Sequence, residues 1–232
     1  PNVMRTEIYG SGLYVGESCL IAFPWLFSIT TNVPKVGNQE GPLEVQLAVS
    51  HDLEHFQRPY RTPIIKPGQP GEWDSGTFST AAYAFDHNDE VWLYYSSSNL
   101  THASPSWYGV KDKHSHEVQT GIGLVKWRKD RFVSADGPKE GAVLTTVPIH
   151  FSGKRLEINA NVKPGGRIVV ELLDMDLQQL ATWPASEPIG GDDLRHIATF
   201  AGKDNVADLV GKPLLLRFHL YDAQLYAFAF RD

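Results

Sequence analysis

The sequence predicts an all-β fold in two parts, and three observations support this prediction. Short runs that alternate between apolar and polar residues are separated by turns rich in Gly, Pro, Asn and Asp, which is the pattern of strands and hairpins. Almost no stretch shows the period of an amphipathic helix. Aromatic residues make up 11% of the 232-residue chain, and aromatic side chains are enriched in strands.

Two sets of predicted strands, alike in order and spacing, occupy the first part of the chain. Repeated four-strand units of this length are typical of the blades of a β-propeller. A propeller needs roughly four to eight blades, so we expect the missing blades to come from an upstream segment of a longer protein or from a second chain. The start PNVMRTEIYG, without an initiator Met or a leader, fits a longer protein. The strands are expected at 7–15, 19–29, 43–50 and 55–59, and again at 76–85, 90–98, 121–128 and 130–136.

From about residue 142 the strands become more evenly spaced, which indicates a second domain. A segment of about ninety residues with this pattern is typical of an antiparallel β-sandwich. The stretch DNVADLVG interrupts it as a single helical turn. We therefore expect blades over 1–141 and a sandwich over 142–232. Its strands are expected at 142–151, 154–162, 167–176, 195–200, 213–222 and 224–232.

The composition argues against several classes of partner and site. A formal net charge of −6 disfavours a nucleic-acid or anionic-membrane partner, since either requires a basic surface. No apolar run is long enough for a membrane span. The single cysteine, Cys19, allows neither an intrachain disulfide nor a cysteine metal site. His114 and His116 lack a third ligand, and the acidic clusters resemble solvated turns, so we expect no metal and no cofactor.

The stretch QPGEWDSGTF places an aromatic side chain beside a carboxylate directly before a predicted strand. The face of Trp73 can stack on the C–H face of a sugar, while Asp74 accepts hydrogen bonds from its hydroxyl groups. The alternative is structural. Asp74 then bonds the backbone N–H groups of the turn, and Trp73 covers the edge of the sheet.

Several stretches resemble the five-bladed β-propeller glycoside hydrolases related to families 32 and 43, in particular a family 32-like subgroup. The resemblance covers nearly the whole chain and implies a partial five-bladed propeller, made of its last blades, followed by a C-terminal β-sandwich. Its motifs are more specific for the fold than for the substrate. They are TEIYGSGLYVGESCLIAFPWLFS, VQLAVSHDLEHFQRP, PGEWDSGTFSTAA, GIGLVKWRKDRFVSAD, FSGKRLEINANV and GKPLLLRFHLYDAQLYAFAF.

The resemblance also implies candidate catalytic and binding residues. These enzymes use three carboxylates, and only the acid has a match here, at Glu7; the two Asp residues would belong to earlier blades. Tyr9 and Trp25 are expected to exclude water from Glu7 and so favour the protonated form that an acid requires. Judged without the resemblance, Glu7 is better explained as a surface carboxylate satisfied by water. In the long loop 99–120, the resemblance implies that His102 faces the central funnel.

The leading hypothesis is that the chain is part of a secreted or periplasmic glycosidase that cleaves a glycosidic bond in an oligo- or polysaccharide. The set of catalytic carboxylates is incomplete in this chain, so activity is expected only in a longer or two-chain protein. The alternative is a non-catalytic carbohydrate-binding or scaffold propeller. A third hypothesis is a propeller assembled from two chains. Carbohydrate is the expected ligand in the first two.

Overall fold

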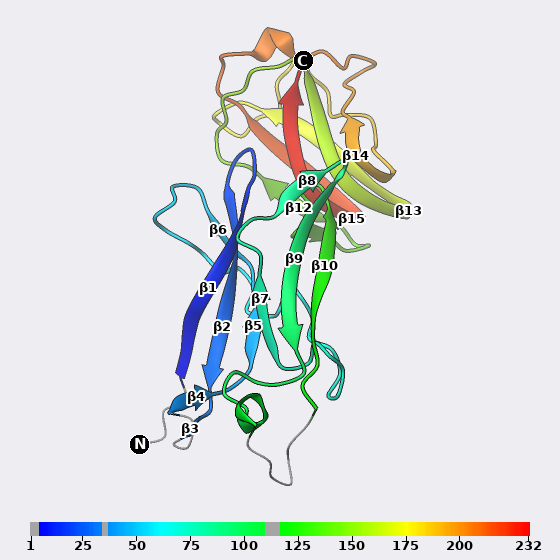
Figure 1. Cartoon of the computed structure of the whole chain (residues 1–232). Coiled ribbons are helices and arrows are strands. Elements are labelled where there is room, and N and C mark those ends of the chain that lie inside the picture. The colour runs from blue at the N-terminus through cyan, green and yellow to red at the C-terminus, as the bar shows by residue number, and fades with distance from the viewer. Residues whose placement is uncertain (1–4, 34–36, 110–116) are drawn as a thin grey trace. The chain divides into compact units, whose positions relative to one another are not determined.

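The structure is a computed structural model that describes residues 5–33, 37–109 and 117–232 (Figure 1). Strands and two short 3₁₀ helices are the regular elements over these ranges, which confirms the predicted all-β class. By its contacts the chain divides into two compact units, Pro1–Trp127 and Arg128–Asp232. The finer layout of propeller blades and sandwich stays a prediction.

The first sheet of the N-terminal unit is centred on a strand that is apolar on both faces. The central strand, with the sequence LIAFPWLFSI, is almost wholly buried and pairs on both sides. Residues 55–59, predicted as a further strand, contribute only a bridge between Val49 and Gln57. A small separate hairpin follows the central strand. The strands are β1 (Arg5–Val15), β2 (Leu20–Ile29), β5 (Leu43–Val45) and β6 (Ala48–Ser50), and the hairpin is β3 (Thr31–Val33) with β4 (Asn38–Glu40).

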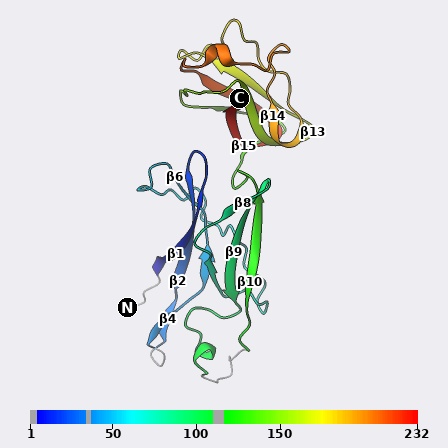
Figure 2. The same ribbon diagram turned by 45° about the horizontal axis from the view of Figure 1, so that its top comes forward.

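The second sheet of this unit has the order β10-β9-β7, and β8 also pairs with β9. Strands β9 and β10 run side by side in both views (Figures 1 and 2). Over the described residues each of the two sheets has four strands, because β5 and β6 both pair with β2, and β7 and β8 both pair with β9. The 3₁₀ helix η1 (Pro105–Tyr108) lies in the connection between β9 and β10. The strands are β7 (Thr77–Thr80), β8 (Phe85–His87), β9 (Glu90–Ser98) and β10 (Thr120–Arg128).

The C-terminal unit is one five-stranded antiparallel sheet in which two strands are far longer than predicted. The stretch 163–166 was expected to be a turn, but it bulges out of a continuous strand, because the register shifts between Val162 and Arg167. Around Ala207 the predicted helical turn is confirmed as η2 (Ala207–Leu209). The strands are β11 (Ala135–Gly137), β12 (Ala142–Thr145), β13 (Arg155–Leu173), β14 (Gly191–Ile197) and β15 (Leu215–Arg231).

Strands β11 and β12 both pair with β15, which places residues 135–145 in the C-terminal unit. By contacts, the first unit ends at Trp127. This position is earlier in the chain than the boundary at 141/142 that the spacing of the predicted strands indicated.

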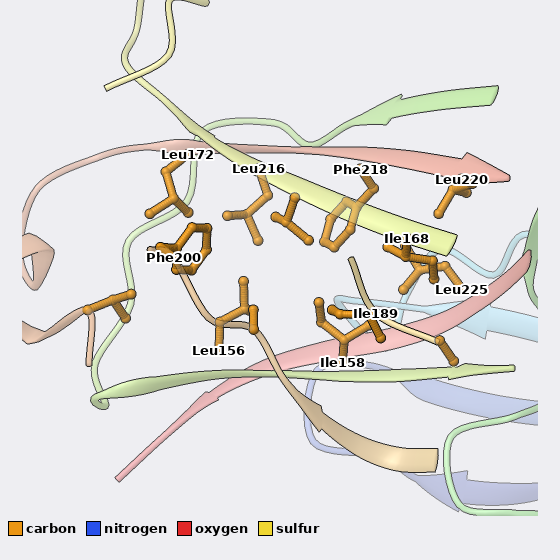
Figure 3. Packing of buried hydrophobic residues seen from close by; sticks show 14 of the residues in the cluster. Leu156, Ile158, Ile168, Leu172, Ile189, Phe200, Leu216, Phe218, Leu220 and Leu225 are labelled. Atoms are coloured by element: carbon orange, nitrogen blue, oxygen red, sulfur yellow. The ribbon is translucent and has the colours of Figure 1, made fainter. Parts of the chain in front are cut away.

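Alternate residues of β13 and β15 build the core of this unit. Leu216, Phe218 and Leu220 of β15 are at most 2% exposed, and they lie in one cluster with Leu156 and Ile158 of β13 (Figure 3). The period of two seen in the sequence is therefore the period of burial, as expected for a sheet with one apolar face.

Candidate functional site

A bulge in β1 brings Tyr9 next to Trp25. The register of β1 and β2 shifts between Ile8 and Gly10, so Tyr9 and Gly10 together oppose Trp25. The indole ring lies close to Gly10, where an added Cβ atom would be 2.6 Å from Trp25 Cε3. A glycine at this position therefore permits the close approach of the ring.

The N-terminal unit contains a cavity of about 580 Å³ that joins aromatic rings to a row of hydroxyl groups. Tyr9, Trp25 and His102, which the sequence analysis selected, all line it. None of the described lining residues carries a carboxylate. The full lining is Tyr9, Trp25, Leu43, Thr77, Phe78, Ser79, Ser96, Ser97, Ser98, His102, Trp107, Thr120, Gly121 and Ile122.

The hydroxyl row arises from the pairing of β7 with β9. Thr77 lies opposite Ser98, and Ser79 lies opposite Ser96, so their side chains share one face of the sheet. The hydroxyl oxygens of Ser79 and Ser96 are 2.7 Å apart. The Ser97 hydroxyl donates its proton to the Thr77 carbonyl at 2.6 Å, so this proton is not available to a ligand. Ser79 and Ser96 keep further hydrogen-bonding capacity for a ligand.

Both indole N–H groups at the cavity are already satisfied inside the protein. Trp25 Nε1 donates to Thr80 Oγ1 at 3.0 Å, and Trp107 Nε1 donates to the Thr101 carbonyl at 2.9 Å. An indole has one donor and no acceptor. These two residues therefore offer a ligand ring surface and no hydrogen bond.

His102 reaches the cavity from the connection after β9. Its Nε2 lies 2.9 Å from the Tyr9 hydroxyl, and its Nδ1 lies 3.0 Å from the carbonyl oxygen of Gln39. The imidazole also packs against Phe27, with ring centroids 4.6 Å apart. The structure thus joins two predicted site residues, Tyr9 and His102, that are distant in the sequence.

Glu7 lies outside the cavity lining. Its carboxylate forms an ion pair with Arg5 at 2.7 Å, and the Glu7 side chain is 43% exposed. Across the strand pair it faces Phe27, whose ring contacts Tyr9 with centroids 5.6 Å apart. Tyr9 and Trp25 therefore line the cavity without enclosing the Glu7 carboxylate.

Trp73 and Asp74 form a packed cluster with Tyr95. The rings of Trp73 and Tyr95 are stacked, with centroids 6.0 Å apart, and Trp73 covers Gly121 of β10. The Tyr95 hydroxyl donates to Asp74 Oδ2 at 3.3 Å. Burial first, and then the charge of Asp74 and this hydrogen bond, raise the pKa of Tyr95 above its usual value. Neither Trp73 nor Asp74 is among the residues that line the cavity.

Neither the hydroxyl row nor Trp107, which belongs to the long loop 99–120, was predicted as part of a site. The signal for the row was present, since TFST and YYSSS both carry hydroxyl residues at alternate positions. His114 and His116 lie outside the described residues. Within the described ranges no group of three or more His, Cys, Asp and Glu side chains is arranged to hold a metal ion. Over the same part of the chain, no helix is long and apolar enough to cross a membrane.

The likeness of this chain to known proteins is weak and structural. No family model matches the chain, and no curated protein matches it. Among solved structures, it is similar to the crystal structure of a glycoside hydrolase family 43 arabinoxylan arabinofuranohydrolase from Bacillus subtilis in complex with cellotetraose. The TM-score is 0.26 and the identity 12%, over 96% of this chain and 53% of that chain. The chain thus spans about half the length of that structure. A likeness at this TM-score carries no argument, so the site is interpreted from its own geometry.

Proposed function

We propose that the N-terminal unit binds a neutral carbohydrate in the cavity between Trp107, Trp25 and the hydroxyl row of β7 and β9. The observation that carries the proposal is the combination of aromatic faces with Ser79 and Ser96 in one cavity. A sugar ring presents apolar C–H faces bordered by hydroxyl groups, and this lining complements both features.

The size and charge of the cavity support the same class of ligand. A volume of about 580 Å³ lies within the range of small-molecule sites, which is roughly 300–1,000 Å³. No Lys, Arg, Asp or Glu is among its described lining residues. An anionic or cationic ligand would be left without a counter-charge there, which is unfavourable. A neutral oligosaccharide avoids this penalty.

Calorimetric titration with neutral oligosaccharides, including cello-, xylo-, arabino- and fructo-oligosaccharides, tests the proposal. We expect Trp107→Ala to weaken binding about tenfold, because loss of an aromatic face costs on the order of 1.4 kcal/mol. The matched control is Tyr108→Ala, which removes the neighbouring exposed ring, absent from the cavity lining. The double variant Ser79→Ala with Ser96→Ala should also weaken binding. Absence of binding by the whole panel at millimolar concentration, or equal affinity of Trp107→Ala and wild type, would contradict the proposal.

Hydrolysis is a second candidate, favoured by the position of Glu7 on β1, two residues before Tyr9. Glycoside hydrolysis requires a second carboxylate on the other side of the scissile bond. We propose that this second carboxylate comes from blades outside this chain, either upstream in a longer protein or in a partner chain. In the complete protein, Glu7→Gln should lower turnover of an unactivated glycoside by about 10²–10⁴-fold, the usual contribution of a general acid. Substrate affinity should be kept, and full turnover by Glu7→Gln would leave carbohydrate binding as the function.

A further inference from the structure

His102 bridges two groups that come from different elements of the N-terminal unit. Its Nδ1 faces the carbonyl oxygen of Gln39 in β4 at 3.0 Å, and its Nε2 faces the hydroxyl group of Tyr9 in β1 at 2.9 Å. The carbonyl oxygen can only accept a hydrogen bond. The proton of the neutral imidazole must therefore sit on Nδ1, and Nε2 is left without one.

This tautomer determines what the Tyr9 hydroxyl does. An unprotonated Nε2 can only accept, so the hydroxyl group of Tyr9 donates its single proton to His102. The lone pairs of the Tyr9 oxygen stay available, and the Tyr9 side chain lines the cavity. Tyr9 can then accept a hydrogen bond from a ligand but has no proton left to give.

We infer that His102 is a positioning residue that makes the Tyr9 hydroxyl an acceptor for a donor hydroxyl group of the carbohydrate. The inference deepens the proposed function and rests on it for the nature of the ligand. The direction of the His102–Tyr9 hydrogen bond is inferred independently of the proposed function.

The segment around His102 is held in place by one carboxylate. Glu40 accepts hydrogen bonds from the Thr101 hydroxyl and, at 2.8 Å, from the backbone N–H of Ala103. The backbone N–H of His102 donates to the Gly41 carbonyl at 3.0 Å. Leu100 and Ala103, on either side, are at most 3% exposed. Side chains fixed by packing and by supporting hydrogen bonds hold a binding group in a defined geometry.

Long-range ¹H–¹⁵N correlation spectra of the uniformly labelled full chain at pH 8.5 test the direction of this bond without any ligand. His102 signals are assigned by their loss in His102→Gln. We expect the pattern of an Nδ1-protonated ring, with an Nε2 signal that moves in Tyr9→Phe, because the donor to that nitrogen is lost. His51 is the internal control, since its Nδ1 also faces a carbonyl oxygen, that of Ser18 at 3.0 Å, and its signals should not move. An Nε2-protonated His102, or an Nε2 signal unchanged in Tyr9→Phe, would overturn the inference.

Affinity measurements with the oligosaccharide that binds most tightly distinguish a positioning role of His102 from a role in packing alone. We expect Tyr9→Phe to weaken binding about three- to tenfold, the usual effect of losing one hydrogen bond. His102→Leu should weaken it similarly, although Tyr9 is still present. His102→Gln should restore part of the affinity, because its amide oxygen can accept the Tyr9 proton. Equal affinities of the Leu and Gln variants would contradict the positioning role. If no oligosaccharide of the panel binds, the proposed function fails, while the spectra still decide the direction of the bond.

Discussion

At the scale of single residues, close contacts between glycine and aromatic rings shape the N-terminal unit. Trp25 lies on Gly10 and Trp73 lies on Gly121, with no room for a Cβ atom in either contact. Both glycines stand in strands, where glycine is otherwise unfavourable. Each therefore marks a place where a ring must approach the backbone.

Gly10→Ala tests this at the cavity wall. The added methyl group would meet Trp25 Cε3 at 2.6 Å, so the ring must move or the bulge must deform. We expect the free energy of unfolding to fall by about 1–3 kcal/mol, as for other overpacked sites, with a change in the near-ultraviolet circular dichroism of Trp25. Gly190→Ala is the control, because a Cβ atom there would meet nothing within 4 Å. An unchanged melting temperature of the N-terminal unit in Gly10→Ala would show that Trp25 adjusts without cost.

The predicted site residues fall into two groups in the structure. Tyr9, Trp25 and His102 lie at one cavity, whereas Trp73 is stacked on Tyr95 beside Asp74. Nothing in the types Trp and Asp distinguishes a sugar platform from a packed cluster. The distinction depends on what the turn that carries Trp73 and Asp74 packs against, here Tyr95 and Gly121, and the sequence does not show these contacts.

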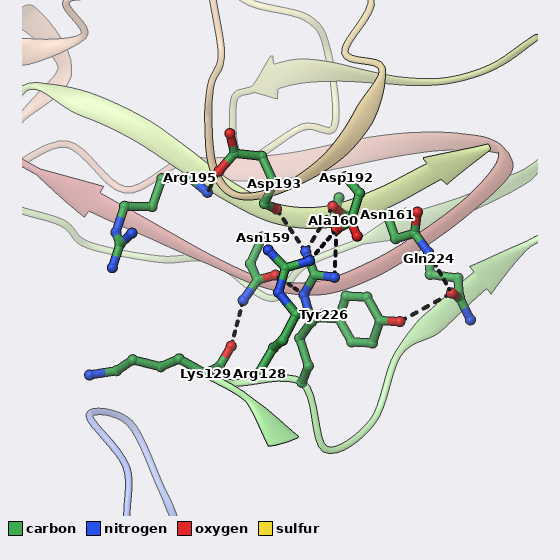
Figure 4. Close-up of polar contacts among 11 residues, drawn as sticks. Arg128, Lys129, Asn159, Ala160, Asn161, Asp192, Asp193, Arg195, Gln224 and Tyr226 are labelled. Atoms are coloured by element: carbon green, nitrogen blue, oxygen red, sulfur yellow. Dashed lines mark hydrogen bonds and ion pairs between the residues drawn. The ribbon is translucent and has the colours of Figure 1, made fainter. Parts of the chain in front are cut away.

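At the scale of elements, Arg131 attaches the segment after β10 to the sheet of the C-terminal unit. Its side chain is only 8% exposed and meets Asp192 Oδ1 at 2.7 Å. It also donates to Asn159 Oδ1 at 2.7 Å and to the carbonyl oxygens of Ala160 and Asp193 at 3.1 and 2.9 Å. These three acceptor residues are labelled in Figure 4. A buried guanidinium group with this many acceptors holds β13 and β14 to the segment that carries it.

Arg131→Ala should therefore destabilise the C-terminal unit by about 2–4 kcal/mol, because the acceptors on the buried residues Asn159 and Ala160 lose their donor. Differential scanning calorimetry of the full chain at pH 7 measures the effect. Lys154→Ala is the control, since the Lys154 side chain is 61% exposed and its ion pair with Asp232 is 3.9 Å long. A loss no larger than that of the control would show that the cluster adds nothing to stability.

The same cluster predicts a dependence on pH. Burial alone would raise the pKa of Asp192, but hydrogen bonds and charges from Arg131, with help from Arg128, outweigh it and hold that pKa below its usual value. A carboxyl group with a lowered folded-state pKa stabilises the fold above its unfolded pKa, about 3.9, and this contribution is lost as the pH falls through the folded value. The difference between wild type and Arg131→Ala should therefore shrink between pH 5 and pH 2.

At the scale of the whole molecule, the two units have separate cores and should unfold as separate transitions. Phe78 in the N-terminal unit and Phe218 in the C-terminal unit are both at most 1% exposed. Replacing a buried phenylalanine with alanine typically costs about 3–5 kcal/mol. Each substitution should lower the melting temperature of its own unit.

Calorimetry and tryptophan fluorescence together assign the transitions. Five of the six tryptophans lie in residues 1–127, and Trp183 alone lies in the C-terminal unit. We expect Phe78→Ala to shift the transition that dominates the fluorescence change and to leave the other in place, and Phe218→Ala to do the reverse. A single transition that moves equally in both variants would show that the two units unfold as one.

Tyr9, Trp25 and His102 were selected through the resemblance to a family, and their role in a site stays a prediction. The sequence by itself determined the all-β class and the approximate positions of most strands. These features depend on local alternation and on residue type, which can be seen without knowing what a strand packs against. Only the tertiary structure decided that 163–166 bulges within β13, that a bulge moves Tyr9 beside Trp25, and that Glu40 fixes the segment carrying His102. The physical reason is that register and bulges depend on contacts between distant segments. A shift of one residue moves a side chain to the other face of a sheet.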